Sequence, residues 1–206
     1  KGINKLEPGT FLMFSRELKV KRFRYWYPNK FLYSSEDLVM NENTVVEELH
    51  DILNTSVTER LTADVPVGVL LSGGIDSSLI ASLAKTNKAD IKTYSVGFKN
   101  KLFDESLYAK KISNYIKTNH INFPLDITNL DKIIEKLPEI YDEPFGDSSQ
   151  IPTCLICNQI KKDVTVALSG DGGDEVFGGY SRYLWAKDFF TINKFLGSRL
   201  LKLMSS

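Results

Sequence analysis

The chain has 206 residues, of which 42% are hydrophobic and 25% are charged, and this ordinary globular composition excludes a disordered or fibrous protein. At roughly 150 residues per domain, the length predicts one domain with part of another attached. The 26 basic residues are balanced by 26 acidic ones, so we expect no nucleic-acid partner. The apolar run at residues 65–71 contains Pro66 and Gly68 and is too short to cross a membrane. The presence of only two cysteines favours a reducing, cytoplasmic location.

The amino-terminal part predicts a β-hairpin followed by a helix. Residues 10–14 and 20–27 are rich in aromatic and β-branched side chains, and the polar residues 15–19 join them. A two-stranded hairpin is hardly stable alone, so we expect it to be the last hairpin of a domain that lies mostly upstream. After a connector at residues 28–43, Thr44 and Glu47 have the spacing of a capping box, which predicts a helix over residues 45–61. The apolar face of this helix comprises Val45, Leu49, Ile52, Leu53 and Leu61.

From residue 67 onward, short apolar strands alternate with amphipathic helices. The strands are expected at residues 67–71, 91–98, 121–125 and 164–168, and the helices from residue 77 and at residues 105–117, 130–141 and 152–162. This alternation predicts an α/β fold, with a doubly wound, mainly parallel sheet flanked by helices and preceded by the short hairpin. In such a fold, ligands bind beyond the carboxyl ends of the strands.

A phosphate-binding loop is predicted at residues 72–78, directly after the first of these strands. Gly73 and Gly74 let the backbone curl around an anion, serine hydroxyls add donors, and the following helix contributes a partial positive charge. The loop lacks the lysine of a Walker motif and the glycine spacing of a dinucleotide fingerprint. Taken alone, the same residues also fit a tight turn with a capping serine, and Asp76 fits a carboxylate that stabilises the start of a helix.

Several ordered motifs resemble the synthetase domain of the glutamine-hydrolysing asparagine synthetases. They lie at residues 65–78, 94–98, 103–105, 142–145 with Asp147 and Ser148, and 169–180. The resemblance implies an adenine nucleotide alpha hydrolase-like fold of the PP-loop type. It also implies three parts: the tail of a glutaminase domain at residues 1–33, a linker and helix at residues 34–62, and an ATP-binding synthetase domain at residues 63–206 that is truncated at its carboxyl end. We expect this fragment to be inactive alone.

The implied reaction activates aspartate with ATP and Mg²⁺, releases pyrophosphate and transfers ammonia from the glutaminase domain to give asparagine. The family places ATP and pyrophosphate contacts at Leu70, Ser72, Gly73, Gly74, Asp76, Ser77, Ser78, Val96, Ser169 and Gly170. It implies metal contacts at Asp76 and Asp174, and a substrate pocket that includes Glu143, Asp147 and Glu175. Asp171 is the candidate for accepting a proton from the attacking ammonia, although many relatives have glutamate there.

Other interpretations remain open for the function and for single motifs. The acceptor could be another carboxylate, such as a polysaccharide sugar acid or a lactam precursor, and a tRNA-modifying pyrophosphatase or a nucleotide-binding module without turnover are further alternatives. Asp104 and Glu105 fit a helix cap as well as a ligand role. Cys154 and Cys157 are expected on the inner face of a helix rather than at a metal. The aromatic residues Phe177, Tyr180, Tyr183, Trp185, Phe189 and Phe190 predict an exposed apolar surface, and a homodimer is conceivable.

Overall fold

The structure is a computed structural model that describes residues 4–27, 41–98, 104–125, 130–143 and 146–186. The chain forms two compact units, Lys1–Leu49 and His50–Ser206. The predicted domain boundary between residues 33 and 34, as well as Phe189 and Phe190, lie outside the described residues. None of the helices in the described ranges has the length and hydropathy that crossing a membrane requires.

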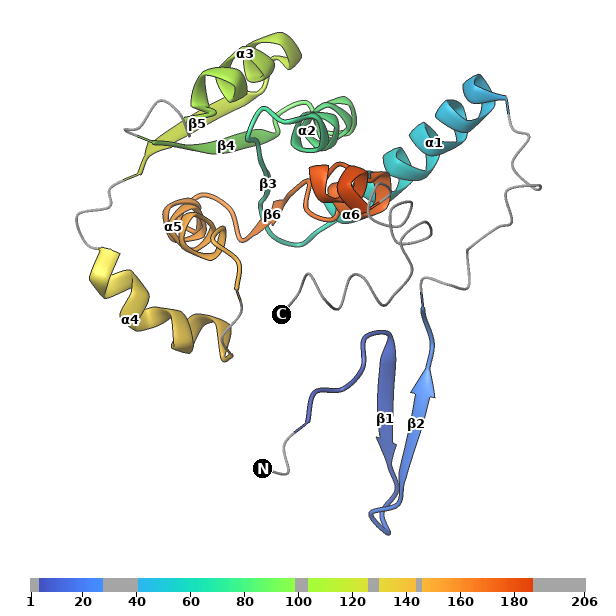
Figure 1. The fold of residues 1–206 in the computed structure, drawn as a ribbon. Helices are drawn as coiled ribbons and strands as arrows, with labels where there is room; N and C mark the ends of the chain where they lie inside the picture. Colours follow the sequence, from blue (N-terminus) through green and yellow to red (C-terminus); the bar gives the residue numbers. More distant parts are fainter. Residues whose placement is uncertain (1–3, 28–40, 99–103, 126–129, 144–145, 187–206) are drawn as a thin grey trace, which may run out of the picture. The chain divides into compact units, whose positions relative to one another are not determined.

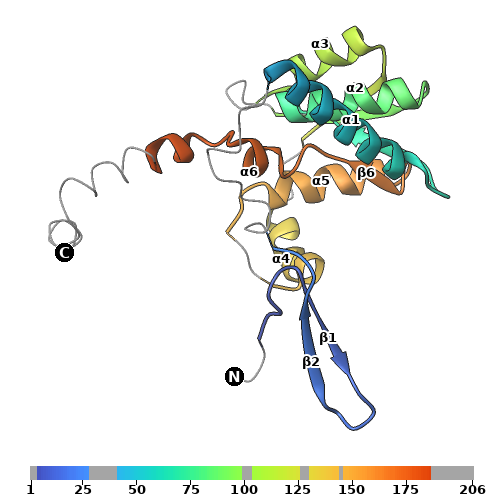
Figure 2. The same ribbon diagram turned by 90° about the vertical axis from the view of Figure 1, so that its right-hand side faces the viewer.

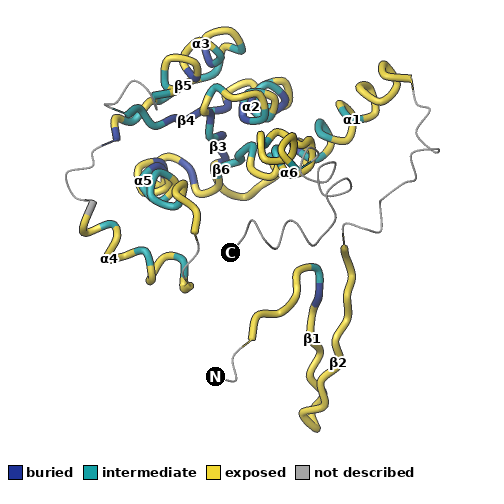
Figure 3. Tube along the Cα trace, in the orientation of Figure 1, coloured by how far each residue is buried: buried dark blue, intermediate teal, exposed yellow. Residues whose placement is uncertain are grey.

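The first unit contains the predicted hairpin (Figure 1). Strands β1 (Thr10–Phe14) and β2 (Val20–Arg24) pair antiparallel, with Phe11 opposite Phe23. These two rings stack with their centroids 5.0 Å apart, which stabilises the cross-strand register. Strand β2 ends three residues before the end of the predicted strand. Most side chains of the hairpin are exposed (Figure 3), in keeping with a hairpin that has no core of its own.

Helix α1 (Glu42–Leu61) begins three residues earlier than predicted, so the proposed capping box is wrong. Thr44 lies inside the helix, and Asn41 caps it instead, because the Asn41 Oδ1 atom accepts a hydrogen bond of 2.9 Å from the amide of Asn43. The predicted apolar face is also wrong at Val45 and Ile52, which are 39% and 65% exposed. The face that packs on the core comprises Leu53, Val57 and Leu61.

The second unit is built on a four-stranded parallel sheet with the strand order β5-β4-β3-β6 (Figure 1). Its strands are β3 (Val67–Leu70), β4 (Lys92–Gly97), β5 (Asn119–Pro124) and β6 (Val166–Leu168). The helices between them are α2 (Ile75–Asn87), α3 (Ser106–Ile116), α4 (Leu130–Tyr141) and α5 (Gln150–Ile160). Each of these elements begins and ends within two residues of its predicted range. A short helix that was not predicted, α6 (Gly173–Phe177), follows β6.

Helices cover both faces of this sheet, as the doubly wound prediction requires (Figure 2). One core joins α1, α2 and α3 to the sheet through residues such as Val69, Leu71 and Ala109. The other core places α5 on the opposite face, where Tyr94 packs with Ile156, Ile160 and Val164. The parallel sheet is therefore buried between two layers, and the loops at the carboxyl ends of its strands remain available for binding.

A polar network lies between β4 and β5 on the face of the sheet that α3 covers. The buried hydroxyls of Thr93 and Ser95 lie 3.0 and 3.1 Å from the two ring nitrogens of His120. Ser95 also donates to the Oδ1 atom of Asn122 over 2.8 Å. Burial, followed by the charge of Lys110, lowers the pKa of His120 below its ordinary value, so the neutral ring is favoured in the folded protein.

Candidate functional site

Two loops meet where the direction of the strand order changes. Strand β3 pairs with β4 on one side and with β6 on the other, and the chain leaves both β3 and β6 at the same edge of the sheet. The loop after β3 leads into α2, and the loop after β6 leads into α6. Ligands of doubly wound proteins bind in the crevice at such a switch point, so the position agrees with the sequence prediction.

The loop after β3 is held in shape by its own serines. The Oγ atoms of Ser72 and Ser77 lie 2.9 Å apart, and Ser72 Oγ accepts a hydrogen bond of 3.2 Å from the amide of Gly74. Ser77 Oγ lies 3.2 Å from the carbonyl oxygen of Gly74, to which it can donate. The backbone passes through a positive φ of 92° at Gly73, a conformation that glycine adopts without strain. These bonds fold residues 72–77 into a compact turn in front of α2.

The amino terminus of α2 is open to an anion. Its N-cap residue is Gly74, which makes no side-chain hydrogen bond to the first-turn amides. Uncapped amides at a helix start, together with the helix dipole, favour a phosphate group. The Oγ atom of Ser78, one turn into the helix, is buried without a hydrogen-bond partner, so it is a further polar group near the loop.

The loop after β6 presents a carboxylate held by a neighbouring hydroxyl. Ser169 Oγ donates to Asp171 Oδ2 over 2.9 Å and accepts a bond of 3.3 Å from the amide of Asp171. The loop then turns through Gly172, whose φ is 92°, into α6. This pair fixes the orientation of the exposed Asp171 carboxylate at the end of β6.

The two loops are in close contact through glycines of the second loop. A Cβ atom at Gly170 would lie 2.7 Å from the amide nitrogen of Ser77, and one at Gly173 would lie 2.5 Å from the carboxylate of Asp76. Beside this contact lies a cavity of about 300 Å³ whose walls come from the loop after β6 and from α1, α2 and α6. It is lined by Leu53, Asp76, Leu79, Ile80, Ser169, Gly170, Asp171, Gly172, Gly173, Val176 and Phe177.

Two of the residues expected to contact ATP, Leu70 and Val96, lie on the face of the sheet that α5 covers. Leu70 at the end of β3 and Val96 near the end of β4 both pack against the core formed with α5. Strands β3 and β4 are direct neighbours in the sheet. The structure thus brings Leu70 and Val96 to one face of the sheet, near the end of β3 from which the chain enters residues 72–78.

The acidic residues of the two loops suit a cation that is shared with phosphate. Asp76 lies in the first turn of α2 beside Gly173, whereas the Asp174 carboxylate occupies the space that a Cβ atom at Gly179 would need. Among the described residues, no three histidine, cysteine or acidic side chains gather into a metal cluster. Mg²⁺ bound to a nucleotide commonly uses one or two carboxylates and takes its other ligands from phosphates and water, so a sparse acidic donor set fits this ion.

The three residues expected in the substrate pocket have different surroundings in the structure. Glu143 lines a separate cavity of about 410 Å³ beside α4, with Ile134, Leu137, Pro138, Tyr141, Asp142 and Gln150. Asp147 accepts a bond of 2.8 Å from the amide of Ser149, and this bond lowers the pKa of its carboxyl group. Glu175 accepts a bond of 2.8 Å from the hydroxyl of Tyr180. Their substrate role stays a prediction.

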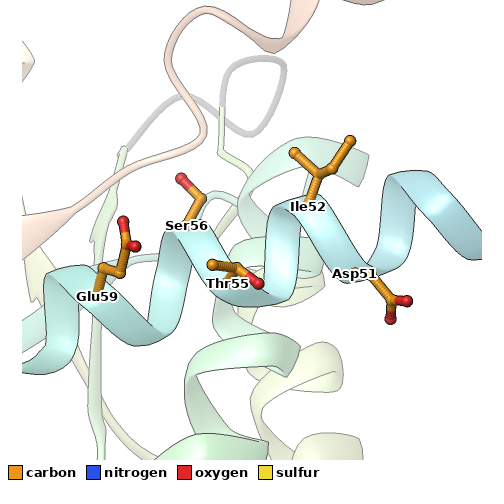
Figure 4. Close-up of a pocket in the computed structure, with 5 residues that line it drawn as sticks. All are labelled: Asp51, Ile52, Thr55, Ser56 and Glu59. Carbon is orange, nitrogen blue, oxygen red and sulfur yellow. The ribbon is translucent and has the colours of Figure 1, made fainter.

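Outside the two loops, the structure tests the prediction for the cysteines of α5 and contains a second hollow on α1. Cys154 is half-buried but Cys157 is exposed, so the prediction that both lie on the inner face of α5 is wrong for Cys157. A hollow of about 360 Å³ on α1 is lined by Asp51, Ile52, Thr55, Ser56 and Glu59, whose side chains are drawn in Figure 4. It contains none of the predicted site residues.

The predicted exposure of the aromatic surface is confirmed at Phe177, Tyr183 and Trp185.

Sequence reasoning missed the contribution of α1 to the site. Leu53 of α1 lines the cavity beside the loop after β6, together with Leu79 and Ile80 of α2. The period of apolar residues in α1 identified Leu53 as a core residue, and that signal alone does not distinguish a core position from the wall of a cavity. Val176 and Phe177 were missed because α6 was not predicted.

Comparison with known proteins identifies the family. A family model described as asparagine synthase matches residues 48–203, which include both loops. The chain belongs to the asparagine synthase family. It is 39% identical to a putative glutamine-hydrolysing asparagine synthetase 2 of Methanocaldococcus jannaschii, over 95% of this chain and 39% of that protein. It is 35% identical to glutamine-hydrolysing asparagine synthetase 1 of Bacillus subtilis, over 88% of this chain and 28% of that protein.

The chain therefore spans less than two fifths of the length of these two relatives. Among solved structures, a glutamine-dependent NAD⁺ synthetase from Acinetobacter baumannii in complex with ADP is similar to 82% of the chain, which covers 31% of that structure. The TM-score is 0.48 and the identity 16%. The parallel strand order, and not this distant similarity, establishes the fold.

Proposed function

We propose that the chain is the synthetase part of a glutamine-hydrolysing asparagine synthetase. In this proposal it is an AMP-forming carbon–nitrogen ligase that activates aspartate as β-aspartyl-AMP, releases pyrophosphate and transfers ammonia to give asparagine. The observation that supports it best is the pair of loops at the switch point of the sheet, in a chain whose family match covers both. The names of the relatives, which are glutamine-hydrolysing asparagine synthetases, support the choice of aspartate as acceptor and glutamine as ammonia source.

The loop after β3 would hold the departing pyrophosphate. In this reaction the carboxylate attacks the α-phosphorus, so the β and γ phosphates leave together and need stabilising as their charge grows. The uncapped amides of α2 and the turn at Gly73 and Gly74 offer backbone donors for that charge. Asp76, and Asp174 less directly, would hold Mg²⁺, which neutralises negative charge on the phosphates when it is bound. Leu70 would pack against the adenine ring, and the backbone of Val96 would hydrogen-bond to it.

The loop after β6 would act in the second half of the reaction. Attack of ammonia on the adenylate leaves a positively charged nitrogen that must lose a proton. Asp171 lines the cavity that the loop after β6 forms with α1, α2 and α6, and the hydroxyl of Ser169 fixes the direction of its carboxylate. We therefore assign proton acceptance to Asp171 and its positioning to Ser169.

The decisive experiment measures pyrophosphate release by the purified full-length protein that contains this chain, with ATP, Mg²⁺ and ammonium, against a panel of acids. Release that depends on aspartate and is matched by asparagine formation supports the proposal. If release depends instead on a sugar acid or a lactam precursor, that compound and not aspartate is the acceptor. Binding of ATP with no release for any acid, by protein shown to be folded, would favour a nucleotide-binding module without turnover.

The role of Asp171 has its own test, in which ATP binding and amide formation are measured separately. Asp171→Asn should slow amide formation from preformed adenylate by about 10²- to 10⁴-fold, the usual size of general-base assistance, and leave ATP affinity nearly unchanged. Asp171→Glu should retain activity, because it keeps a carboxylate at the same place. If the Asn variant forms amide as fast as the parent, Asp171 only shapes the turn.

A further inference from the structure

Asp104 joins the end of strand β4 to the start of helix α3. Its Oδ1 atom accepts a hydrogen bond of 3.3 Å from the amide of Phe98, directly after β4, and one of 3.1 Å from the amide of Ser106, the first residue of α3. Glu105, the N-cap residue by position, makes no side-chain bond to the helix. Hydrogen bonds from Ser106, followed by the amide of Phe98, lower the pKa of Asp104, so its carboxylate is charged at neutral pH.

The first turn of α3 also supports the loop after β3. A Cβ atom at Gly73 would lie 2.7 Å from the amide nitrogen of Ala109 and 2.7 Å from the Cβ atom of Tyr108. Ala109 itself is fully buried in the core that α3 shares with α2 and the sheet. The loop backbone is therefore seated on the turn of α3 that begins two residues after Asp104, and a shift of this turn would move Gly73.

The end of β4 is close to the same turn. A Cβ atom at Gly97 would lie 3.6 Å from the Cβ atom of Ser106. One carboxylate thus fixes a helix that contacts two places of the candidate site: the end of β4, which follows Val96, and the turn at Gly73. In the proposed function these are the adenine end and the phosphate end of the bound nucleotide.

We infer that Asp104 is a positioning residue of the nucleotide site, which sets the spacing between the end of β4 and the loop after β3. It does not touch ATP in this proposal, and it acts through the first turn of α3. The inference rests on the proposed function for the identity of the ligand, but the mechanical link between Asp104 and the loop can be tested without any nucleotide.

The first experiment compares the affinities of ATP, AMP and inorganic pyrophosphate by calorimetry. ATP must reach both ends of the site at once, whereas AMP or pyrophosphate alone can settle at one end. Asp104→Ala should weaken ATP by about 5-fold or more, the equivalent of one lost helix cap, and weaken AMP and pyrophosphate by less. Asp104→Asn, which keeps an acceptor oxygen at the cap, should restore most of the ATP affinity.

Asn41→Ala is the matched control, because it removes a cap of the same kind from α1, where Asn41 accepts from the amide two residues on. It should lower stability without changing the ratio of ATP to pyrophosphate affinity. The inference would be overturned if Asp104→Ala weakened the affinity for all three ligands equally, or if the control changed the ratio of ATP to pyrophosphate affinity in the same way. Asp104 would then be an ordinary helix cap. Unchanged ATP affinity would also overturn it.

The second experiment follows amide hydrogen exchange in the absence of nucleotide. Asp104→Ala should speed exchange severalfold at Ser106 and also at Gly73 and Gly74, while Asn41→Ala should leave these amides unchanged. Faster exchange confined to Ser106 would show that the loop does not depend on Asp104. If the parent protein binds none of the three ligands but the coupled exchange is present, the proposed function fails and the link between Asp104 and the loop stands.

Discussion

Replacing Gly170 by alanine tests the contact on which the candidate site depends. In the structure, a Cβ atom at this position would lie 2.7 Å from the Ser77 nitrogen and 2.9 Å from two atoms of Asp76. Two of these three atoms belong to the backbone of the first turn of α2, which cannot turn aside as a flexible side chain could. Gly170→Ala should therefore separate the two loops.

The size of the separation follows from the same distances. Ordinary contacts of a Cβ atom begin at about 3.4 Å, so the loops must part by about 0.7 Å to accept the methyl group. Misplacement of reacting groups by about 1 Å can cost on the order of 10²-fold in rate. We expect kcat/KM for pyrophosphate release to fall by roughly 10²-fold, and the free energy of unfolding by about 1–3 kcal/mol, the usual cost of overpacking.

Gly146→Ala is a suitable control, because a Cβ atom at Gly146 would have no neighbour within 4 Å among the described residues. The assay pairs pyrophosphate release with thermal unfolding for the parent and the two variants. The control should match the parent in both measurements. If Gly170→Ala also retains the rate and stability of the parent, the loops are not packed as closely as the structure has them, and the assignment of one shared site fails.

Three further outcomes test other parts of the molecule. A Cβ atom at Gly68 would lie 2.6 Å from the ring of the buried Tyr94, so Gly68→Ala should lower the free energy of unfolding by about 1–3 kcal/mol, and combining it with Tyr94→Leu should cost less than the two single changes added together. Asp76→Asn should weaken ATP binding with Mg²⁺ but not without it, and equal calorimetric losses in both conditions would leave Asp76 as a helix-start carboxylate only. Because the pKa of His120 is below 6.5 in the folded protein, the unfolded chain binds more protons at acidic pH. The contribution of His120 to the free energy of unfolding should therefore be fully present above pH 6.5 and be lost as the pH falls through the lower pKa of the folded state. In His120→Gln this part of the acid-induced loss, followed by urea unfolding at several pH values, should disappear.

The order and type of most elements in the second unit could be predicted, because glycine and proline positions and the periodicity of apolar residues indicate the same boundaries there. Strand β3 is a short apolar run that is followed, after Leu71 and Ser72, by two glycines, and α4 has the clear apolar period of an amphipathic helix. The start of α1 was missed because two competing caps lie three residues apart. Thr44 has the favourable pattern, but Asn41 is the residue whose side chain reaches the first-turn amide. Sequence alone does not rank two such caps.

The candidate site was predicted in its location but not in its contacts. The strand-end position of residues 72–78 and 169–175 follows from topology, which any doubly wound sheet imposes. The hydrogen bonds among Ser72, Ser77 and Gly74 could not be predicted, because the hydroxyls were expected to face a ligand and instead brace the loop. The seat of Gly73 on α3 depends on tertiary packing between segments more than thirty residues apart, which no local pattern contains.

These contacts change the explanation of the glycines. From the sequence, the glycines of both loops were interpreted as positions that let the backbone curl around an anion. In the structure, Gly73 is pressed against α3, and Gly170 and Gly173 are pressed against the first turn of α2. A side chain at any of these three positions would force apart segments that must meet before an anion can be bound. Close packing between elements is therefore the first requirement for glycine at these positions, and it in turn holds the amide donors of α2 in place for the phosphates.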